Sequence, residues 1–299
     1  PYGIDLMAWL KDPSTRPPQA ILANGVTSQP LIFVAQAAQL AALERFGFSS
    51  KNIDEWAVAT TGHSQGIVTA VLAAEAHSID SLTERSASIA RYLLWQGISM
   101  QTAYGRGNQS DAPMVAITGQ TRDELEAAMK GLPISISLIN APRRFVVSGQ
   151  PEDLKLCVQR LEKRSGTENA AFDAGLSARP RSLHIEWLGV SGPFHSPILT
   201  DAMARTRDAM DRIGVSFDPK TLKTPVIRFE DGTAWNGEDL VASQTVNVVD
   251  WPSTINGAMD LEPTHILDAG PGLGVSAISA LCCRGYGVQV IAVATETGE

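Results

Sequence analysis

The chain has 299 residues, of which 44% are hydrophobic and 19% charged, and its formal net charge is -8. A chain of this length buries a substantial core, either as one large domain or as a domain with a subdomain. The negative charge disfavours nucleic acid as the main partner, because binding phosphates requires a basic surface. No run of consecutive apolar residues approaches the roughly 18 that a membrane span needs, so we expect no membrane partner.

The N-terminus and the cysteines favour a cytoplasmic location. The first 18 residues have no basic segment followed by an apolar stretch, so no signal peptide is expected. The lack of an initiator Met suggests an excised domain or a processed fragment. Cys157, Cys282 and Cys283 cannot all pair with one another, which fits a reducing compartment. No cluster of His, Cys and Asp has the spacing of a metal site.

Helical spacing of apolar residues predicts the first elements. We expect a helix over 30–47, ending at a glycine suited to a C-cap, then a short strand over 55–60. Two further helices are predicted over 65–77 and over about 81–104.

The middle of the chain has a different pattern. Strands are predicted in "APMVAITG", "ISISLIN", "RFVVSG" and "RSLHIEWLGV", with helices in "TRDELEAAMKG" and "PEDLKLCVQRLEKRSG". Thr121 and Glu124 form a capping-box pattern at the start of the first of these helices. The order β-α-β-β-α-β is that of a ferredoxin-like subdomain.

After this segment the chain returns to alternating helices and strands, ending with the strand "VQVIAVAT". We therefore predict an α/β fold with a largely parallel sheet, formed by residues 1–112 and 190–299. The ferredoxin-like subdomain, residues 113–189, interrupts it.

The sequence Gly62-His63-Ser64-Gln65-Gly66 lies between the predicted strand and the helix over 65–77. It fits the Gly-x-Ser-x-Gly nucleophile elbow, in which a tight turn exposes the serine hydroxyl at a helix N-terminus. We interpret both glycines as required because the turn leaves no room for a Cβ. The alternative is a serine that merely caps an ordinary helix.

A serine nucleophile needs a base, and five histidines are available. His63 adjoins the serine, but its side chain should point away on a sharp turn. The other candidates, except one, lie in helix or strand patterns: His77, His184 and His265. His195 lies in "VSGPFHSPILT", between a Gly-Pro bend and a Ser-Pro step, which favours it as the base.

Five segments occur in an order that resembles the acyl-carrier-protein acyltransferases: "GHSQGIVTA", "LINAPRRFVVSGQPEDL", "SGPFHSPIL", "VVDWPSTI" and "THILDAGPGLG". The closest resemblance is to the acetyl (starter) transferase domain of type I fatty acid synthases of the fungal β-subunit type, and to polyketide synthase starter acyltransferases. It covers nearly the whole chain. It implies an α/β-hydrolase-like domain carrying the small subdomain.

The resemblance also implies roles for individual residues. Ser64 would accept the acyl group, His195 would act as its base, and the N–H of Gln65 would be an oxyanion donor. The backbone carbonyl of Gln244 would orient the histidine. Independently of these roles, Asn140 is a candidate for a substrate hydrogen bond because it ends a subdomain strand that should face the cleft between the two domains. Phe194 is a further candidate for the substrate pocket.

The sequence departs from the family pattern at two places, one relevant to the substrate and one to the oxyanion hole. Carboxyacyl-selecting members carry an Arg on the helix after the elbow, and the matching position here holds Gln96. A neutral amide cannot form the bidentate ion pair with a malonyl carboxylate, so acetyl or longer unbranched acyl groups are expected. Trp95 is a candidate for the pocket or for the helix core. The family's Gly-Gln-Gly turn, which helps to build the oxyanion hole, does not precede Ser64.

The implied reaction moves an acyl group from acyl-CoA to the phosphopantetheine of an acyl carrier protein, with no tightly bound cofactor. Neighbouring synthase domains or subunits would be further partners. The alternatives are a thioesterase or serine hydrolase, with Asp268 as triad candidate, and an inactive structural domain of a synthase.

Gly270, Gly272 and Gly274 do not have dinucleotide-binding spacing. Arginines at 143, 144, 179 and 181 are either solvated surface or a landing site for a phosphorylated cofactor or an acidic carrier.

Overall fold

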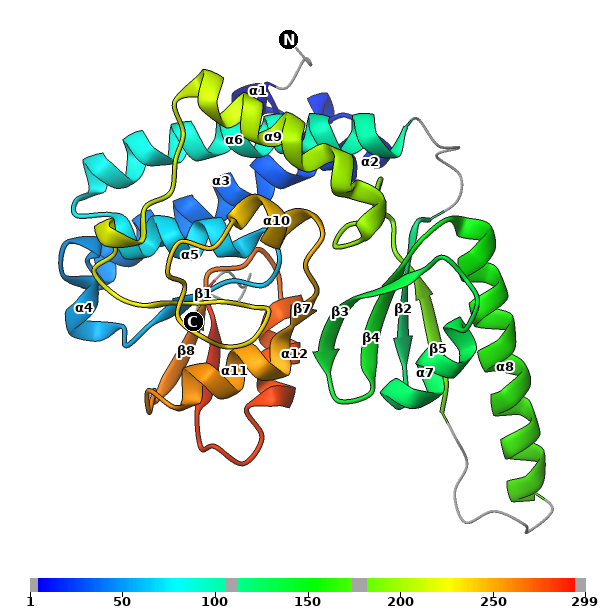
Figure 1. The fold of residues 1–299 in the computed structure, drawn as a ribbon. Coiled ribbons are helices and arrows are strands. Elements are labelled where there is room, and N and C mark those ends of the chain that lie inside the picture. Colours follow the sequence, from blue (N-terminus) through cyan, green and yellow to red (C-terminus); the bar gives the residue numbers. More distant parts are fainter. Residues whose placement is uncertain (1–4, 106–111, 174–181, 294–299) are drawn as a thin grey trace.

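The computed structural model describes residues 5–105, 112–173 and 182–293. Two parts lie side by side in Figure 1: a larger part with helices over short parallel strands, and a smaller part in which a sheet is backed by two helices. The chain runs through the larger part, then the smaller one, and then returns.

Helices α1 (Leu6–Lys11), α2 (Gln19–Leu22) and α3 (Gly25–Leu43) come first. The expected helix over 30–47 begins five residues early, because the side chain of Asn24 accepts a hydrogen bond from the Val26 N–H and caps the helix. Pro30, the expected start, lies inside α3. A 3₁₀ turn over Glu44–Phe46 follows, and Gly47 ends it with a φ of 90°.

The segment Gly25–Phe46 is long and apolar enough to cross a membrane, with a mean hydropathy of 1.2 over its best window. Polar residues such as Gln36 and Gln39 interrupt this segment, so it is not a continuous apolar run. Core helices pass the same test, and α3 contributes the fully buried Phe33 and the buried Ala37 to the main core.

The strand expected over 55–60 is wrong except at its last residue. Residues Ile53–Trp56 form the short helix α4, and the strand β1 comprises only Thr60–Thr61. The Trp56 indole donates to the Ser49 carbonyl at 2.9 Å and packs edge-on against Phe48. These contacts fold residues 49–56 back on themselves, which an extended strand would not allow.

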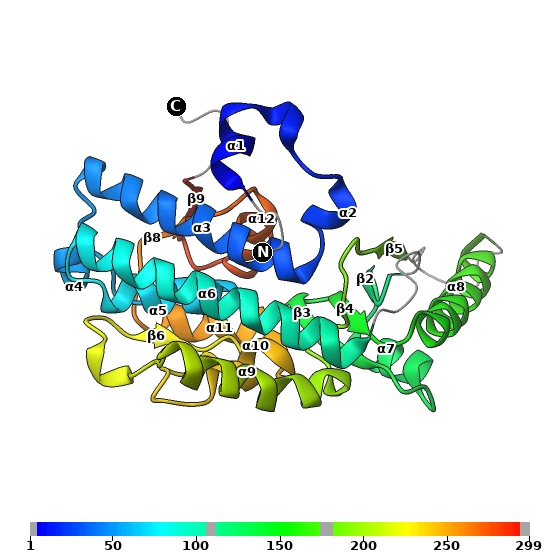
Figure 2. The same ribbon diagram turned by 90° about the horizontal axis from the view of Figure 1, so that it is seen from above.

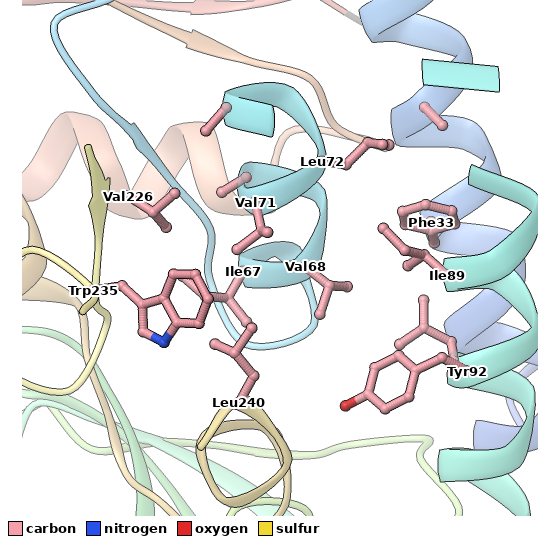
Figure 3. Close-up of a cluster of buried hydrophobic side chains, with 14 of the residues drawn as sticks. Phe33, Ile67, Val68, Val71, Leu72, Ile89, Tyr92, Val226, Trp235 and Leu240 are labelled. Atoms are coloured by element: carbon pink, nitrogen blue, oxygen red, sulfur yellow. The ribbon is translucent and has the colours of Figure 1, made fainter. Parts of the chain in front are cut away.

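Helix α5 (Gly66–Glu75) is the centre of the larger core. Figure 3 shows its Ile67 and Val71 facing Val226 and Trp235, while Phe33 and Ile89 approach from the opposite side. Figure 2 shows three long helices lying alongside one another over this core, namely α3, α6 (Ile79–Tyr104) and α9 (Thr200–Ile213). An α-helix buried on nearly every side explains the continuous apolar sequence after the elbow.

The smaller part is the ferredoxin-like subdomain. Its elements are β2 (Met114–Thr118), α7 (Arg122–Met129), β3 (Ser135–Ala141), β4 (Arg144–Ser148), α8 (Pro151–Asp173) and β5 (His184–Trp187). The strands are antiparallel in the order β5-β2-β4-β3. Both halves of the Thr121–Glu124 capping box are present.

A fifth strand, β7 (Val249–Asp250), pairs in parallel with β3 and joins the subdomain sheet to the rest of the chain. The larger part has two further parallel pairs, β1 with β6 (Val226–Ile227) and β8 (His265–Asp268) with β9 (Gln289–Ala292). The remaining elements are α10 (Leu240–Thr245), α11 (Trp251–Met259), α12 (Gly274–Cys282) and 3₁₀ turns over Ser50–Asn52, Pro13–Thr15, Pro197–Leu199 and Pro219–Thr221.

Candidate active site

The turn between β1 and α5 has the geometry of a nucleophile elbow. Ser64 has a left-handed φ of 53°, a conformation that is uncommon for a residue with a side chain. A Cβ at Gly62 would lie 2.0 Å from the carbonyl carbon of Gly66, so only glycine fits there. A Cβ at Gly66 would be 3.8 Å from its nearest neighbour. The expectation that both glycines are sterically required is therefore right for Gly62 and wrong for Gly66.

The side chains of Ser64 and His195 meet. The serine Oγ lies 2.6 Å from the histidine Nε2, across 131 positions of sequence. His195 is only 2% exposed and has a left-handed φ of 55°. It precedes Ser196, which caps the 3₁₀ turn Pro197–Leu199 by accepting from the Ile198 N–H. Two uncommon backbone conformations thus direct these two side chains toward each other.

The other ring nitrogen of His195 fixes which nitrogen accepts. Nδ1 lies 2.7 Å from the backbone carbonyl oxygen of Asn247, which can only accept a hydrogen bond. In the neutral ring the proton is therefore on Nδ1, and Nε2 is free to accept the Ser64 hydroxyl proton.

The assignment of the orienting carbonyl to Gln244 is wrong by three residues. Gln244 lies inside α10, and its side chain has a different set of partners. Asn247 follows the C-cap residue Val246, so its carbonyl lies beyond the helix and is free to point at the histidine. The resemblance that suggested Gln244 does not indicate where α10 ends.

Burial keeps His195 neutral. Loss of solvent lowers the pKa of His195 to about 4, an effect that the Asn247 carbonyl opposes and that neighbouring His63 reinforces. At neutral pH the ring is unprotonated, which is the state that a general base requires.

His63 links the elbow to the subdomain. Its Nε2 lies 2.9 Å from Oδ1 of Asn140, near the end of β3, and its ring packs edge-on against Trp251. Burial lowers the pKa of His63, and its hydrogen bond with Asn140 partly opposes that shift. Asn140 thus lies at the site, as expected, but its side-chain oxygen is engaged by His63. No sequence pattern indicates that His63 and Asn140 pair.

Gln96 and Gln244 belong to one buried polar network with Tyr92. The Tyr92 hydroxyl donates to Oε1 of Gln244 at 2.6 Å, and Nε2 of Gln96 donates to both partners at 3.1 and 3.2 Å. Gln96 is fully buried and Gln244 is 4% exposed. Within the described residues, Oε1 of Gln96, Nε2 of Gln244 and Oγ1 of Thr245 are buried without a protein partner.

Two proposed pocket residues have other surroundings. Trp95 is 39% exposed and lies under the guanidinium of Arg212, 5.6 Å from the ring centroid. It faces α9 at the surface, so neither a pocket nor a core role fits. Phe194, next to His195, packs against the cluster of Met100 and Leu199.

Gln65 is the N-cap residue of α5, where the first N–H groups of a helix have no partner inside the helix. This is the geometry that an oxyanion donor needs. The Gln65 side chain forms no capping hydrogen bond. Among the described residues, neither its Oε1 nor its Nε2 has a partner, although both atoms are buried.

Asp268 does not reach the histidine. One carboxylate oxygen accepts from the Gly270 N–H at 2.9 Å, and the other accepts from the Ser276 hydroxyl. Asp268 therefore closes the glycine turn after β8. Gln36 of α3 ties this turn to the elbow helix, because its Nε2 donates to the Gly270 carbonyl and its Oε1 accepts from Thr69.

Within the described residues, Arg143, Arg144 and the cysteines form no second site. Arg143 donates to the Gly119 carbonyl and lies 3.9 Å from the Glu124 carboxylate, while Arg144 is exposed on β4. Arg179 and Arg181 lie outside the described residues. Cys157, Cys282 and Cys283 are free thiols, and no metal-binding cluster of His, Cys, Asp and Glu occurs in the described ranges.

A family model described as the starter unit:ACP transacylase in aflatoxin biosynthesis matches residues 3–172. That match covers more than half of the 299 residues. The chain belongs to this family. The matched range includes the elbow serine and the subdomain up to α8, whereas His195 lies beyond it.

Two curated relatives are fungal. The chain is 30% identical, over its whole length, to the fatty acid synthase beta subunit aflB of Emericella nidulans. It is 29% identical, over 98% of its length, to the fatty acid synthase subunit beta of Saccharomyces cerevisiae. The chain spans only 15% and 16% of the lengths of these two proteins.

Solved structures of transacylases share the fold. The malonyl-CoA:acyl carrier protein transacylase of Xanthomonas oryzae superposes with a TM-score of 0.74 at 21% identity, covering 99% of this chain and 84% of the other. A malonyl-transacylase in complex with its type II polyketide synthase acyl-carrier protein gives 0.73 at 20% identity, covering 99% and 85%. They confirm the expected α/β fold with a small ferredoxin-like subdomain.

Proposed function

We propose that this chain transfers an acetyl or other non-carboxylated acyl starter unit from acyl-CoA to an acyl carrier protein, through an acyl-Ser64 intermediate. The observation that carries this proposal is the 2.6 Å contact between Ser64 Oγ and His195 Nε2, in a member of the starter-unit transacylase family. Transfer would serve fatty acid or polyketide synthesis, as the names of the relatives suggest.

The reaction would proceed in two halves. His195 Nε2 accepts the Ser64 proton as the serine oxygen attacks the thioester carbonyl, and the backbone N–H of Gln65 stabilises the oxyanion. Collapse of the tetrahedral intermediate expels CoA, with the His195 proton neutralising the leaving thiolate. In the second half, His195 deprotonates the phosphopantetheine thiol of the carrier protein, and this thiolate attacks the acyl-serine. The bond between the acyl carbon and Ser64 Oγ then breaks, and His195 returns its proton to the serine oxygen.

The orienting group supports a dyad. The Asn247 carbonyl holds the Nδ1 proton of His195, a task that an Asp carboxylate performs in the Ser-His-Asp triad. A carbonyl is neutral and stabilises the imidazolium less than a carboxylate does. The buried, low-pKa histidine fits this arrangement because it is protonated only transiently.

The preference for a neutral acyl group rests on Gln96. In the described residues, no lysine or arginine is buried, whereas Gln96 is fully buried and hydrogen-bonded to Tyr92 and Gln244. Burying a malonyl carboxylate without a cation beside it carries a desolvation free energy of roughly several kcal/mol. Two proteins with solved structures of the same fold are named as malonyl transacylases, so this selectivity would distinguish the chain from them.

The acceptor would be an acyl carrier protein, and neighbouring synthase domains or subunits would be further partners. One structural relative is a malonyl-transacylase bound to its acyl-carrier protein. Acyl-CoA and carrier-bound phosphopantetheine enter as substrates, and the mechanism uses no tightly bound cofactor.

A serine hydrolase is the main alternative within enzymes. It is disfavoured because Asp268, its triad candidate, is hydrogen-bonded to Gly270 and Ser276. An inactive structural domain is disfavoured because the Ser64–His195–Asn247 arrangement is intact.

Mass spectrometry of the intact protein after exposure to a panel of acyl-CoAs tests the proposal. Acetyl-CoA should add one acetyl group, mapped to Ser64 in the peptide, and holo acyl carrier protein should then remove it as acyl carrier protein thioester. Absence of any acyl-serine would refute the transferase mechanism. Release of free acid faster than transfer to the carrier would favour the hydrolase, and a malonyl adduct in preference to acetyl would refute the selectivity.

A further inference from the structure

The backbone groups near the His195 imidazole on its Nδ1 side come from one short stretch. The Asn247 carbonyl lies 2.7 Å from Nδ1, and the backbone of Ser243 is close enough to raise the pKa of the ring. Both residues belong to the second half of α10 and the loop after it. The orientation of the histidine therefore depends on what holds residues 243–247 in place.

One carboxylate holds both of these residues by their side chains. Oε1 of Glu230 accepts a hydrogen bond from the Ser243 hydroxyl at 2.5 Å and another from the Asn247 amide at 3.2 Å. Charge-assisted hydrogen bonds of this kind are about twice as strong as neutral ones. Glu230 thus binds the side chain of Asn247, whose carbonyl faces His195, and the side chain of Ser243 in the helix just before it.

Glu230 is itself well fixed. Its side chain is 13% exposed, and its Oε2 lies 3.5 Å from Nε of Arg228, which also pairs with Asp231 and Glu238. Backbone hydrogen bonds between Arg228 and the segment around Thr233 close this turn directly after β6. Because β6 pairs with β1, the strand that leads into the elbow, the turn is anchored to the same frame as Ser64.

The residue before Glu230 contacts the histidine from another side. The ring of Phe229 packs edge-on against the His195 imidazole, with 5.7 Å between centroids, and the Phe229 carbonyl accepts from the Asp250 N–H at 2.7 Å. The turn after β6 therefore touches the imidazole directly through Phe229 and indirectly through Glu230.

We propose that Glu230 is a positioning residue for His195, holding the Ser243 and Asn247 side chains so that the Asn247 carbonyl points at Nδ1. This inference rests on the proposed function, in which His195 is the base. Glu230 does not touch the imidazole, so it does not serve as a triad acid. It restrains the segment that presents the carbonyl, and a misaimed base slows proton transfer without weakening substrate binding.

The test compares Glu230→Ala and Glu230→Gln with the matched control Glu238→Gln, which also loses a charge beside Arg228 but makes no contact with residues 243–247. The measurements are the single-turnover rate of Ser64 acylation by acetyl-CoA, the KM for acetyl-CoA, and the low-field proton NMR signal of His195 Nδ1–H. A His195→Ala sample assigns that signal.

We expect Glu230→Ala to lower the acylation rate by about 10- to 100-fold with KM changed less than about twofold. Its Nδ1–H signal should weaken or shift. Glu230→Gln keeps one acceptor oxygen and should recover part of the rate, and Glu238→Gln should match wild type. Equal acylation rates and an unchanged Nδ1–H signal in Glu230→Ala would overturn the proposal.

A second approach covers the case in which Glu230→Ala does not fold. Ser243→Ala and Asn247→Ala break the same contacts from the other side while keeping the backbone carbonyls, and each should slow acylation. If wild type itself forms no acyl-serine, the proposed function fails. The NMR signal then still decides whether Glu230 positions the ring.

Discussion

The side chains of Ser64 and His195 meet although 131 positions of sequence separate the two residues. Their side chains are 2.6 Å apart, and both residues have left-handed φ angles, 53° and 55°. Such conformations in residues other than glycine cost roughly 1–3 kcal/mol each and persist where the surrounding structure imposes them. Here the elbow turn imposes one, and the 3₁₀ turn Pro197–Leu199 follows directly after the other.

Replacing either member of this pair should abolish acyl transfer. Ser64→Ala should leave no acyl adduct on the protein, and His195→Ala should lower the acylation rate by about 10⁴- to 10⁶-fold. Stopped-flow release of CoA and intact mass measure both. An acyl adduct that persists in Ser64→Ala would place the nucleophile elsewhere.

The pH dependence should follow the buried histidine. Because burial lowers the pKa of His195 to about 4, the acylation rate should be flat from about pH 8 down to about pH 5 and fall only below that. An ordinary histidine would produce an acid limb near its usual value of about 6.5. An acid limb there would show that His195 is not buried in solution.

The same shift affects stability, with a definite sign. The folded pKa of His195 is lower than the unfolded value, so the unfolded chain binds the proton first as pH falls below about 6.5. The His195 contribution to stability is therefore full above that pH and lost on going down toward pH 4. His63, with a pKa lowered in the same direction, adds to the loss. Thermal unfolding should show a smaller acid-induced drop in Tm for His195→Gln than for wild type.

Introducing a cation at Gln96 should change the substrate preference. Gln96→Arg places a charge in the buried Tyr92–Gln244 network, which should cost roughly 3–5 kcal/mol without a counter-ion. Malonyl-CoA supplies that counter-ion, so malonyl use should rise relative to acetyl by about tenfold or more. Competition assays with both thioesters measure the ratio. The control Gln96→Met adds no charge, and a ratio unmoved by Gln96→Arg would show that residue 96 does not face the acyl group.

The two elbow glycines should differ in their tolerance of alanine. Gly62→Ala drives a Cβ into the Gly66 backbone and should lower the free energy of unfolding by more than about 2 kcal/mol. Gly66→Ala meets ordinary contact distances at the first position of α5 and should change it by less than about 1 kcal/mol. Chemical denaturation distinguishes them, and equal losses would contradict the elbow geometry.

Asp268 separates the transferase from the hydrolase mechanism. Its carboxylate accepts from Gly270 and Ser276, so Asp268→Asn should reduce acyl transfer by less than about tenfold, through a loosened turn alone. Loss of a triad aspartate lowers kcat by about 10⁴-fold. A loss of that size would reinstate Asp268 as the group that orients the histidine.

Short sequence patterns were sufficient to predict the elements that depend on interactions between residues close together in the chain. The Thr121–Glu124 capping box and the β-α-β-β-α-β order predicted the subdomain, since caps and strand periodicity act between near neighbours in sequence. The elbow motif predicted Ser64 for the same reason. The strand predicted over 55–60 was wrong because the contacts of Trp56 with Ser49 and Phe48 outweigh the preference of a short apolar run for a strand.

The elbow motif and the loop position of His195 were enough to predict the type of chemistry, in which a histidine activates a serine on a glycine turn. The atoms that assist this pair follow from long-range packing, which these motifs do not indicate. Because α10 ends before Asn247, the carbonyl of Asn247 and not that of Gln244 contacts His195. Trp95 of α6 lies at the surface under Arg212 of α9, and Asn140 forms a hydrogen bond with His63. These outcomes depend on where helices end and which faces they bury, and both are set by contacts between residues far apart in the chain.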